Sequence, residues 1–221
     1  MKTTVAFFDF DGTLIKGDSI LRFCIYSFKN KHATLGQFLK TLCAGLGYLL
    51  SIISASKSKE IALSFCKNKD EVALQKLAES FCNDVLIPSL YVKGQEEIKK
   101  HLDKGTKVIL VSASPEFYLM PLKNKLKLTD ILATPMEFNS QRIFTGKVGN
   151  NCKGEEKPIR INNYLKQKGI KLNIETSSAY GDTASDYPMM KMVNNRFIIR
   201  PKRKLSKLAK TDSKVTTFMW N

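Results

Sequence analysis

The chain has 221 residues, of which 43% are apolar and 25% charged, and 36 Lys and Arg stand against 20 Asp and Glu, a formal net charge of +16. This length allows one α/β core with a smaller inserted unit, and the composition excludes a disordered chain. The positive charge favours anionic partners such as nucleic acid, anionic lipid or phosphorylated substrates, although a solvated Lys-rich surface gives the same balance.

The first predicted element is a buried strand over residues 5–8, an apolar run that ends at the acidic loop Asp9-Phe10-Asp11-Gly12. Residues 19–88 show no strand pattern, and their apolar positions recur at helical spacing, which predicts a helical segment. A further helix is predicted over 94–102, closed by Gly105.

Strands and helices alternate over the remaining chain. The pattern predicts strands over 107–111, 131–134, 178–180 and 196–199, helices over 115–126, 158–168 and 186–193, and a β-ribbon over 137–148 that turns at Asn139. Such alternation is typical of a doubly wound parallel sheet. We therefore expect an α/β core formed by residues 1–17 and 93–221, with an all-helical cap, residues 18–92, inserted after the first strand.

The cysteines and the N-terminus bear on the cell compartment. Five widely spaced cysteines without a Cys-x-x-Cys pair indicate buried thiols in a reducing compartment rather than a disulfide framework or a zinc site. His32 and His101 form no metal-ligand pattern. The first residues contain acids and no long apolar run, so no signal peptide is predicted and we expect a cytoplasmic protein.

Four polar groups lie at the ends of predicted strands or at the start of a predicted helix. They are the loop 9–13, the Ser-Ala-Ser stretch 112–114, the lysines of segment 152–157, and the Gly-Asp stretch 181–186. The functional crevice of an open α/β sheet lies beyond the carboxyl ends of its strands, so the four groups are expected to converge. Each alone is weak, because Asp-x-Asp-Gly is a common turn and Ser-x-Ser often caps a helix.

Together these residue types suit the hydrolysis of a phosphate monoester. The carboxylate of Asp9 can form an aspartyl-phosphate, provided that a divalent cation offsets the repulsion between two anions. Mg²⁺ prefers carboxylate ligands, which Asp9 and Asp182 supply. A lysine and the Ser112 hydroxyl can stabilise the transferring phosphoryl group, and Asp11 can protonate the leaving oxygen and later activate water.

In this order the motifs resemble those of the haloacid dehalogenase superfamily, and the stretches VILVSAS and AYGDTASDYPMM resemble most its subfamily IB, the phosphoserine-phosphatase-like hydrolases. The resemblance implies a Rossmann-like core with a helical cap, Mg²⁺ as cofactor, and phosphatase rather than dehalogenase activity. It also implies roles: Asp9 as nucleophile and metal ligand, Asp11 as general acid/base that lends a backbone carbonyl to the metal, Thr13 as loop support, Ser112 with Ala113 at the phosphoryl group, and Asp182 and Asp186 at the metal.

The lysine of this motif set has two candidates. Relatives place it just before the helix that precedes the Gly-Asp strand, which favours Lys157, and Pro158 after it suits a first helical turn. Lys153 is the alternative.

Phosphoserine is one candidate substrate. Asp18 stands where phosphoserine phosphatases carry the cap acid that binds the substrate amine, but no arginine occurs between Arg22 and Arg142 to hold the carboxylate. Lys57 or Lys59 can replace it only without a bidentate contact.

A lipid phosphate is the second candidate. Residues 41–56 contain no charge, and as a helix rising ~1.5 Å per residue they fall short of the ~30 Å core of a bilayer. They form either a buried central helix of the cap or a membrane-contacting helix. The resembling subfamily includes phosphatidylglycerophosphatase C, a lipid phosphatase whose cap is likewise apolar. Residues 187–211 contain no acid, which supports peripheral attachment at the inner face of a membrane, and their cations are Lys191, Arg196, Arg200, Lys202, Arg203, Lys204, Lys207 and Lys210.

The same basic segment leaves a third alternative, a non-catalytic protein that binds nucleic acid. Aromatic residues are not interleaved with the cations and no helix-turn-helix or RNA-binding pattern occurs, so nucleic acid is the least favoured partner.

Overall fold

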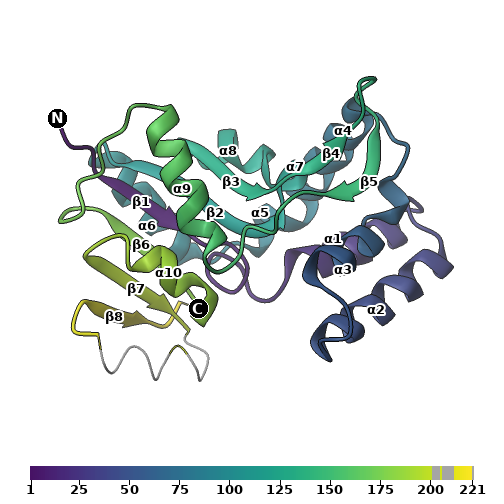
Figure 1. Ribbon diagram of the computed structural model, residues 1–221, viewed down its shortest axis with the longest axis horizontal. Coiled ribbons are helices and arrows are strands. Elements are labelled where there is room, and N and C mark those ends of the chain that lie inside the picture. The colour runs from purple at the N-terminus through teal and green to yellow at the C-terminus, as the bar shows by residue number, and fades with distance from the viewer. Residues whose placement is uncertain (201–204, 206–211, 221) are drawn as a thin grey trace.

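The computed structural model describes residues 1–200, 205 and 212–220. Within them, the main sheet has six parallel strands in the order β3-β2-β1-β6-β7-β8 (Figure 1). The strands are β1 Val5–Phe8, β2 Lys107–Pro115, β3 Asp130–Thr134, β6 Ser178–Gly181, β7 Asn195–Ile199 and β8 Val215–Phe218. The predicted doubly wound parallel sheet is confirmed.

β1 occupies the centre of the sheet because its four apolar residues can be buried on both faces. All four are fully buried, and the strand pairs with β2 on one side and β6 on the other. Alternate side chains point to opposite faces, so Ala6 and Phe8 join one hydrophobic cluster while Val5 and Phe7 join the other. The loop after β1 is therefore held at the middle of the sheet edge.

Helices cover both faces of this sheet. Helix α6, Val92–Asp103, contributes Ile98 to the cluster on one face, and helix α9, Glu156–Gln167, contributes Ile161 and Leu165 to the other. The predicted ribbon is present as the antiparallel pair β4 Met136–Phe138 and β5 Phe144–Val148.

Two predicted helices differ from the structure, and one strand was not predicted. The helix expected over 115–126 is wrong, since β2 continues to Pro115 and two short helices follow, α7 Glu116–Leu119 and α8 Pro121–Lys125. Pro121 lacks the N–H that an unbroken helix would need. The helix expected over 186–193 is a 3₁₀ turn, Ala184–Asp186, followed by α10 Tyr187–Met190. Strand β8 was not predicted.

Residues 18–92, all of them described, form helices, as predicted. They are α1 Ser19–Lys29, α2 Leu35–Leu49, α3 Ala55–Ala62, a 3₁₀ turn Ser64–Cys66, α4 Glu71–Phe81, a π-helical turn Cys82–Leu86 and α5 Ile87–Ser89. Side chains of Asp18, Thr34, Ser54 and Asp70 accept backbone N–H groups at the starts of α1 to α4.

The two halves of residues 18–92 occupy different positions relative to the main sheet. Helices α1 to α3 project beside the sheet, whereas α4 packs against α7, with Phe81 and Tyr118 in edge-to-face contact at 5.4 Å between ring centroids (Figure 1). A single hydrophobic cluster includes Phe23 of α1, Phe81 of α4 and Phe8 of β1. The boundaries of a separate cap at residues 18 and 92 stay a prediction.

The uncharged stretch 41–56 is not a buried central helix, and that interpretation is wrong. Helix α2 ends at Leu49, a turn follows, and α3 begins at Ala55. Of the residues in α2, only Thr41 and Ala44 are buried. The leucines of this stretch are largely exposed, because no described element packs on the outer side of the helix.

Three other expectations can be placed on the structure. No helix in the described ranges is long and apolar enough to cross a membrane. All five cysteines are free, and four are buried as expected, whereas Cys43 on α2 is exposed. Of the predicted basic segment, Lys191, Arg196 and Arg200 are described, while residues 202–204, 207 and 210 lie outside the described residues.

Candidate active site

The loop after β1 carries the first acidic pair in a fixed conformation. The Asp9 N–H donates to Tyr180 O at 2.9 Å, and the Leu14 N–H donates to Phe10 O at 2.8 Å. Gly12 has a φ of +86°, and a Cβ on it would lie 2.2 Å from Asp182 Oδ2. Glycine is therefore required both by the backbone conformation and by the close approach of the second acidic loop.

Three buried carboxylates meet beyond the strand ends. Asp9 follows β1, Asp182 follows β6, and Asp186 ends the 3₁₀ turn after it. One ligand oxygen from each of the three lies within 4.8 Å of the others, and the residues are 6%, 2% and 1% exposed. Parallel strands that end at the same edge bring together residues that are more than 170 positions apart.

Lys157 enters this carboxylate cluster from the first turn of α9. Its Nζ donates to Asp9 Oδ1 at 2.6 Å, to Asp186 Oδ1 at 2.7 Å and to Val111 O at 2.8 Å. Although burial opposes the charge, the two carboxylates raise the pKa of Lys157 above its ordinary value. The lysine is therefore held as a cation against the nucleophile candidate.

One lysine does not neutralise three carboxylates. Burial, and then repulsion by Asp186 and Asp182, raises the pKa of Asp9 to about 8 despite the opposing contact with Lys157. For Asp186 the contact with Lys157 outweighs burial and lowers the pKa. A divalent cation among the three oxygens would favour the charged form of Asp9, and an all-carboxylate donor set is one that Mg²⁺ accepts. The residues thus fit a magnesium ion.

Asp11 lies outside this cluster. Its carboxylate accepts the Ser19 N–H at 2.6 Å and the Ser114 hydroxyl. Burial, followed by the nearby Asp18, raises the pKa of Asp11 to about 6. A carboxyl group with such a pKa can exchange a proton near neutral pH, which suits the predicted acid/base role. Its predicted backbone contact to the metal stays a prediction.

The other predicted phosphate-binding residues surround Asp9 and Asp11. The Thr13 hydroxyl donates to Asp9 Oδ2 at 3.0 Å. Ser112 is buried within β2, three residues before the strand ends, and its hydroxyl accepts the Ser114 N–H at 3.0 Å. Ala113 and Ser114 line the cavity described below, whereas Ser112 lies behind them. Asp18 also lines the cavity, and its carboxylate caps α1 by accepting the Ile20 N–H at 2.9 Å.

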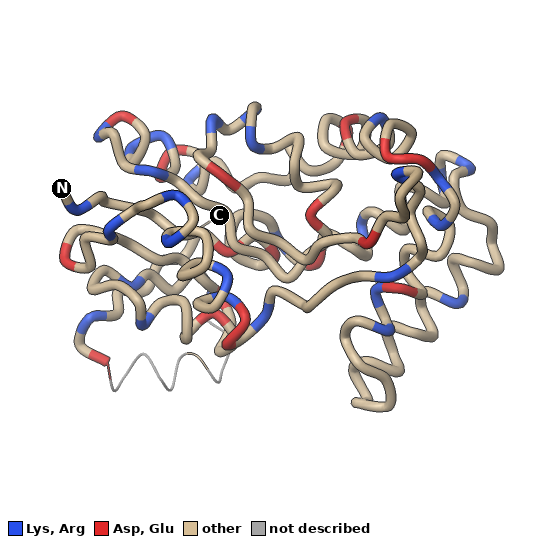
Figure 2. The backbone as a smooth tube through the Cα atoms, turned by 45° about the horizontal axis from the view of Figure 1, so that its top comes forward, with Lys and Arg blue, Asp and Glu red and all other residues tan. Residues whose placement is uncertain are grey.

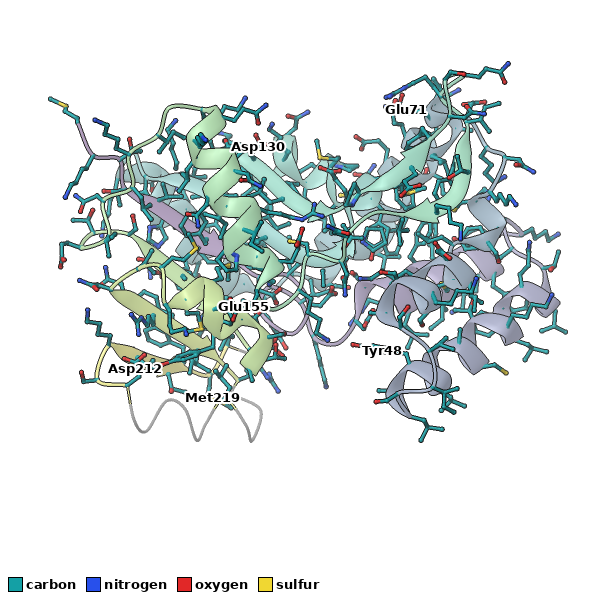
Figure 3. The ribbon with its side chains drawn as sticks, in the orientation of Figure 1. Tyr48, Glu71, Asp130, Glu155, Asp212 and Met219 are labelled. Atoms are coloured by element: carbon teal, nitrogen blue, oxygen red, sulfur yellow. The ribbon has the colours of Figure 1, made fainter. Side chains whose placement is uncertain are left out.

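Lys153 also lines the cavity, but its side chain contacts the projecting helices. Its Nζ donates to the hydroxyl of Tyr48 at 2.9 Å. Figure 3 places Tyr48 on the side of the projecting helices that faces α9. Between the two candidate lysines, only Lys157 contacts Asp9, so the geometry agrees with the preferred assignment.

A cavity of about 930 Å³ joins these groups. Its floor carries Asp9, Asp11 and the second acidic loop, and its opposite wall consists of apolar residues of α1 and α2. Several further polar residues line it that sequence reasoning did not place at the site, among them Lys59, Asn151 and Arg200. Lys59 was considered only as a replacement for an arginine, and Arg200 could have been found because it directly follows β7 at the carboxyl edge of the sheet.

Lys59 is the most unusual of these. It extends from α3 to donate to Asn151 Oδ1, and it is close to Lys153. Burial, and then repulsion by Lys153, lowers the pKa of Lys59 to about 8. The Lys59 and Lys153 ammonium groups, which both line the cavity, give it a second region that can bind an anionic group of a ligand.

Comparison with known proteins agrees with this arrangement. The haloacid dehalogenase-like hydrolase family matches residues 6–191. The Mycobacterium tuberculosis protein named phosphoserine phosphatase SerB1 is 29% identical over 215 residues, covering 94% of this chain and 68% of that protein.

Solved structures give the same picture at the level of the fold. A Bordetella pertussis Tohama I protein of unknown function superposes with a TM-score of 0.88 at 24% identity, covering 100% of this chain and 99% of that one. A substrate-bound phosphoserine phosphatase superposes with a TM-score of 0.64 at 20% identity, covering 94% and 90%.

Proposed function

Because the chain belongs to the haloacid dehalogenase-like hydrolase family, we propose that it is a magnesium-dependent phosphatase that hydrolyses phosphate monoesters through an aspartyl-phosphate on Asp9. The observation that carries the proposal is the buried group of Asp9, Asp182 and Asp186, joined by Lys157 beside the cavity that Asp11 also lines. A buried set of titratable residues with shifted pKa values in a cavity is typical of a catalytic site.

In the first proposed step a carboxylate oxygen of Asp9 attacks the phosphorus atom. A bond forms between that oxygen and phosphorus, the bond from phosphorus to the leaving oxygen breaks, and Asp11 gives its proton to the leaving oxygen. The Lys157 ammonium and residues Ser112 to Ser114 of β2 stabilise the charge on the phosphoryl oxygens. Thr13 keeps the Asp9 carboxylate oriented.

In the second step water replaces the enzyme at phosphorus. Asp11, now a carboxylate, takes a proton from a water molecule whose oxygen bonds to phosphorus, and the bond from phosphorus to Asp9 breaks. Inorganic phosphate leaves and Asp9 is restored. Mg²⁺, when held by Asp9, Asp182 and Asp186, supplies positive charge that lets one anion approach another.

The residues of the site say less about the leaving group of the substrate than about the reaction at phosphorus. A relative and a structural neighbour are named phosphoserine phosphatases. In this chain, however, the Asp18 carboxylate already accepts two backbone N–H groups at the start of α1, and lysines stand where a carboxylate would need an arginine. The apolar wall formed by α1 and α2 favours a phosphate attached to a group with apolar surface.

The test is phosphate release with Mg²⁺ from three substrates, namely an aryl phosphate, phosphoserine, and phosphatidylglycerophosphate in mixed micelles. We expect release that stops in Asp9→Asn and after chelation with EDTA, and the preferred substrate distinguishes the soluble from the lipid alternative. If no substrate is hydrolysed and EDTA has no effect, the catalytic proposal is wrong. A salt-dependent mobility shift of DNA or RNA in that case would support the nucleic-acid-binding alternative.

A further inference from the structure

An apolar stripe along α2 has no part in the catalytic steps. Leu35, Leu39, Leu42, Leu46 and Leu49 recur three or four residues apart, which places them on one face of the helix. The stripe continues through Leu50 into the turn before α3. We call the full set the α2 ridge, and its members are Leu35, Leu39, Leu42, Leu46, Leu49, Leu50 and Ile52.

The α2 ridge is exposed to an extent that is unusual for leucine and isoleucine. The exposed fractions run from 39% for Leu42 to 77% for Leu49. Single exposed leucines are ordinary, but five on one face of α2 and two more in the turn that follows form an extended apolar surface, which is typical of an interaction site. The ridge runs the length of α2, a helix that lies on the side of the molecule away from the sheet (Figure 1).

The charges around the ridge select the kind of partner. Residues 19–59 contain no Asp or Glu, and Figure 2 shows the turn between α2 and α3 without any charged residue, with cations on the neighbouring helices. The cations of this segment are Arg22, Lys29, Lys31, Lys40, Lys57 and Lys59. The neighbouring helix α3 also carries Glu60, but this side chain is 14% exposed and pairs with Lys57, so the exposed border of the stripe is mainly positive. Such a stripe is complementary to an anionic lipid surface. A second copy of this chain would bring a net charge of +16 toward it and be repelled.

The ridge is continuous with the catalytic cavity. Leu42, Leu46 and Leu49 are exposed and also line the cavity that contains Asp9. Leu21 of α1, 44% exposed, lines the same cavity. An apolar path therefore leads from the outer surface of α2 to the carboxylate cluster, so a molecule with an apolar chain could reach Asp9 with its phosphate while its chain stays on leucine side chains.

From these observations we infer that the α2 ridge docks on the surface of an anionic lipid bilayer, and that the enzyme takes phosphomonoester substrates from that surface. The substrate part of this inference rests on the proposed function, whereas the docking part does not. Burial of the ridge in the interfacial region supplies apolar contact, and the bordering cations supply attraction that salt weakens.

The experiment removes apolar surface that does not line the cavity. The ridge variant is Leu39→Ser with Leu50→Ser and Ile52→Ser, and the matched control is Val72→Ser with Val92→Ser and Ile159→Ser, which removes equally exposed side chains elsewhere. Full-length proteins are sedimented with phosphatidylcholine vesicles that contain or lack phosphatidylglycerol. In parallel, hydrolysis of a soluble aryl phosphate is measured for all three proteins.

We expect the parent chain and the control to bind vesicles that contain phosphatidylglycerol, with binding lost in high salt. The ridge variant should bind at least about tenfold more weakly, because three apolar side chains no longer enter the lipid. Equal binding by the ridge variant and the control overturns the inference, as does a parent dimer that becomes a monomer only in the ridge variant. If the parent chain does not hydrolyse the aryl phosphate, the proposed function is contradicted. The vesicle sedimentation still tests the docking inference in that case.

Discussion

Lys157 shows what sequence reasoning can and cannot resolve at the scale of one residue. Asp9 and Asp182 could be predicted to converge because each directly follows a strand of one parallel sheet, and Asp186 lies in the turn that follows the second of these strands. The two lysines lie in a loop and at a helix start only four residues apart, and sequence spacing cannot tell which one turns inward. In the fold, the first turn of α9 directs Lys157 to Asp9 and leaves Lys153 beside Tyr48.

This geometry predicts opposite outcomes for the two lysines. Lys157→Met should abolish phosphate release, and without Mg²⁺ it should lower the free energy of unfolding by about 3–5 kcal/mol, because buried carboxylates lose their only lysine partner among the described residues. Urea unfolding in EDTA and turnover of an aryl phosphate check both effects. Lys153→Met should keep kcat and raise KM. An active Lys157→Met together with an inactive Lys153→Met would reverse the assignment.

Lys59 predicts how binding depends on pH. Because burial and the neighbouring Lys153 lower its pKa to about 8, Lys59 is cationic below that pH and neutral above it. KM for an anionic substrate should therefore rise as the pH increases through about 8. Lys59→Arg keeps its charge throughout this range, so the rise should disappear in that variant. A rise of the same size in Lys59→Arg would show that another group titrates.

At the scale of elements, strands with a continuous apolar run could be predicted and β8 could not. Strand β8, at the edge of the sheet, has the sequence Val-Thr-Thr-Phe, and three of its four residues are exposed, so it has no hydrophobic pattern to detect. Its position depends on tertiary contacts, including stacking of Phe218 on Phe197 and the Arg200 N–H donating to Phe218 O at 2.9 Å. The broken helix after β2 was missed for a related reason, since Pro115 was interpreted as a helix start but ends a strand.

The attachment of β8 makes a prediction about stability. Arg196 of β7 donates to Asp212 Oδ2 at 2.5 Å, just before β8 begins. Although burial acts in the opposite sense, this contact and the Lys214 N–H lower the pKa of Asp212 below its ordinary value. A carboxyl group with a lowered pKa in the folded state stabilises the fold above its ordinary pKa, and this stabilisation is lost as the pH falls through the lowered value.

Asp212→Asn should therefore lower the free energy of unfolding by about 1 kcal/mol near neutral pH, and the difference from the parent chain should shrink below about pH 4. Thermal unfolding over this pH range measures it. Asp103→Asn is the matched control, since its pair with Lys99 is exposed on both sides and should contribute nothing measurable. A constant deficit at every pH would mean that the charge of Asp212 is not what holds β8.

At the scale of the whole molecule, the sequence predicted a parallel core with inserted helices, but not how the helices meet the core. Two contacts cross the cavity from the projecting helices to the segment before α9, from Tyr48 to Lys153 and from Lys59 to Asn151. All four residues are polar, and neither hydrophobic periodicity nor motif spacing in the sequence predicts that these two pairs are in contact. Such contacts exclude water around the carboxylate cluster, which an aspartyl-phosphate requires until the leaving group has departed.

If the hydrogen bond between Lys153 and Tyr48 stabilises the arrangement in which the projecting helices close the cavity, substitutions of the two residues should not have independent effects. Tyr48→Phe and Lys153→Met should each lower kcat/KM, mainly through KM, because substrate binding then has to stabilise closure without this hydrogen bond. The double variant should be little worse than either single variant, which corresponds to a coupling of about 1 kcal/mol, or about fivefold in kcat/KM. The exposed pair Lys99 and Asp103 gives a reference cycle in which the effects on kcat/KM should be negligible. Independent, multiplying effects of Tyr48→Phe and Lys153→Met would mean that each residue contacts the substrate separately and that closure does not depend on their hydrogen bond.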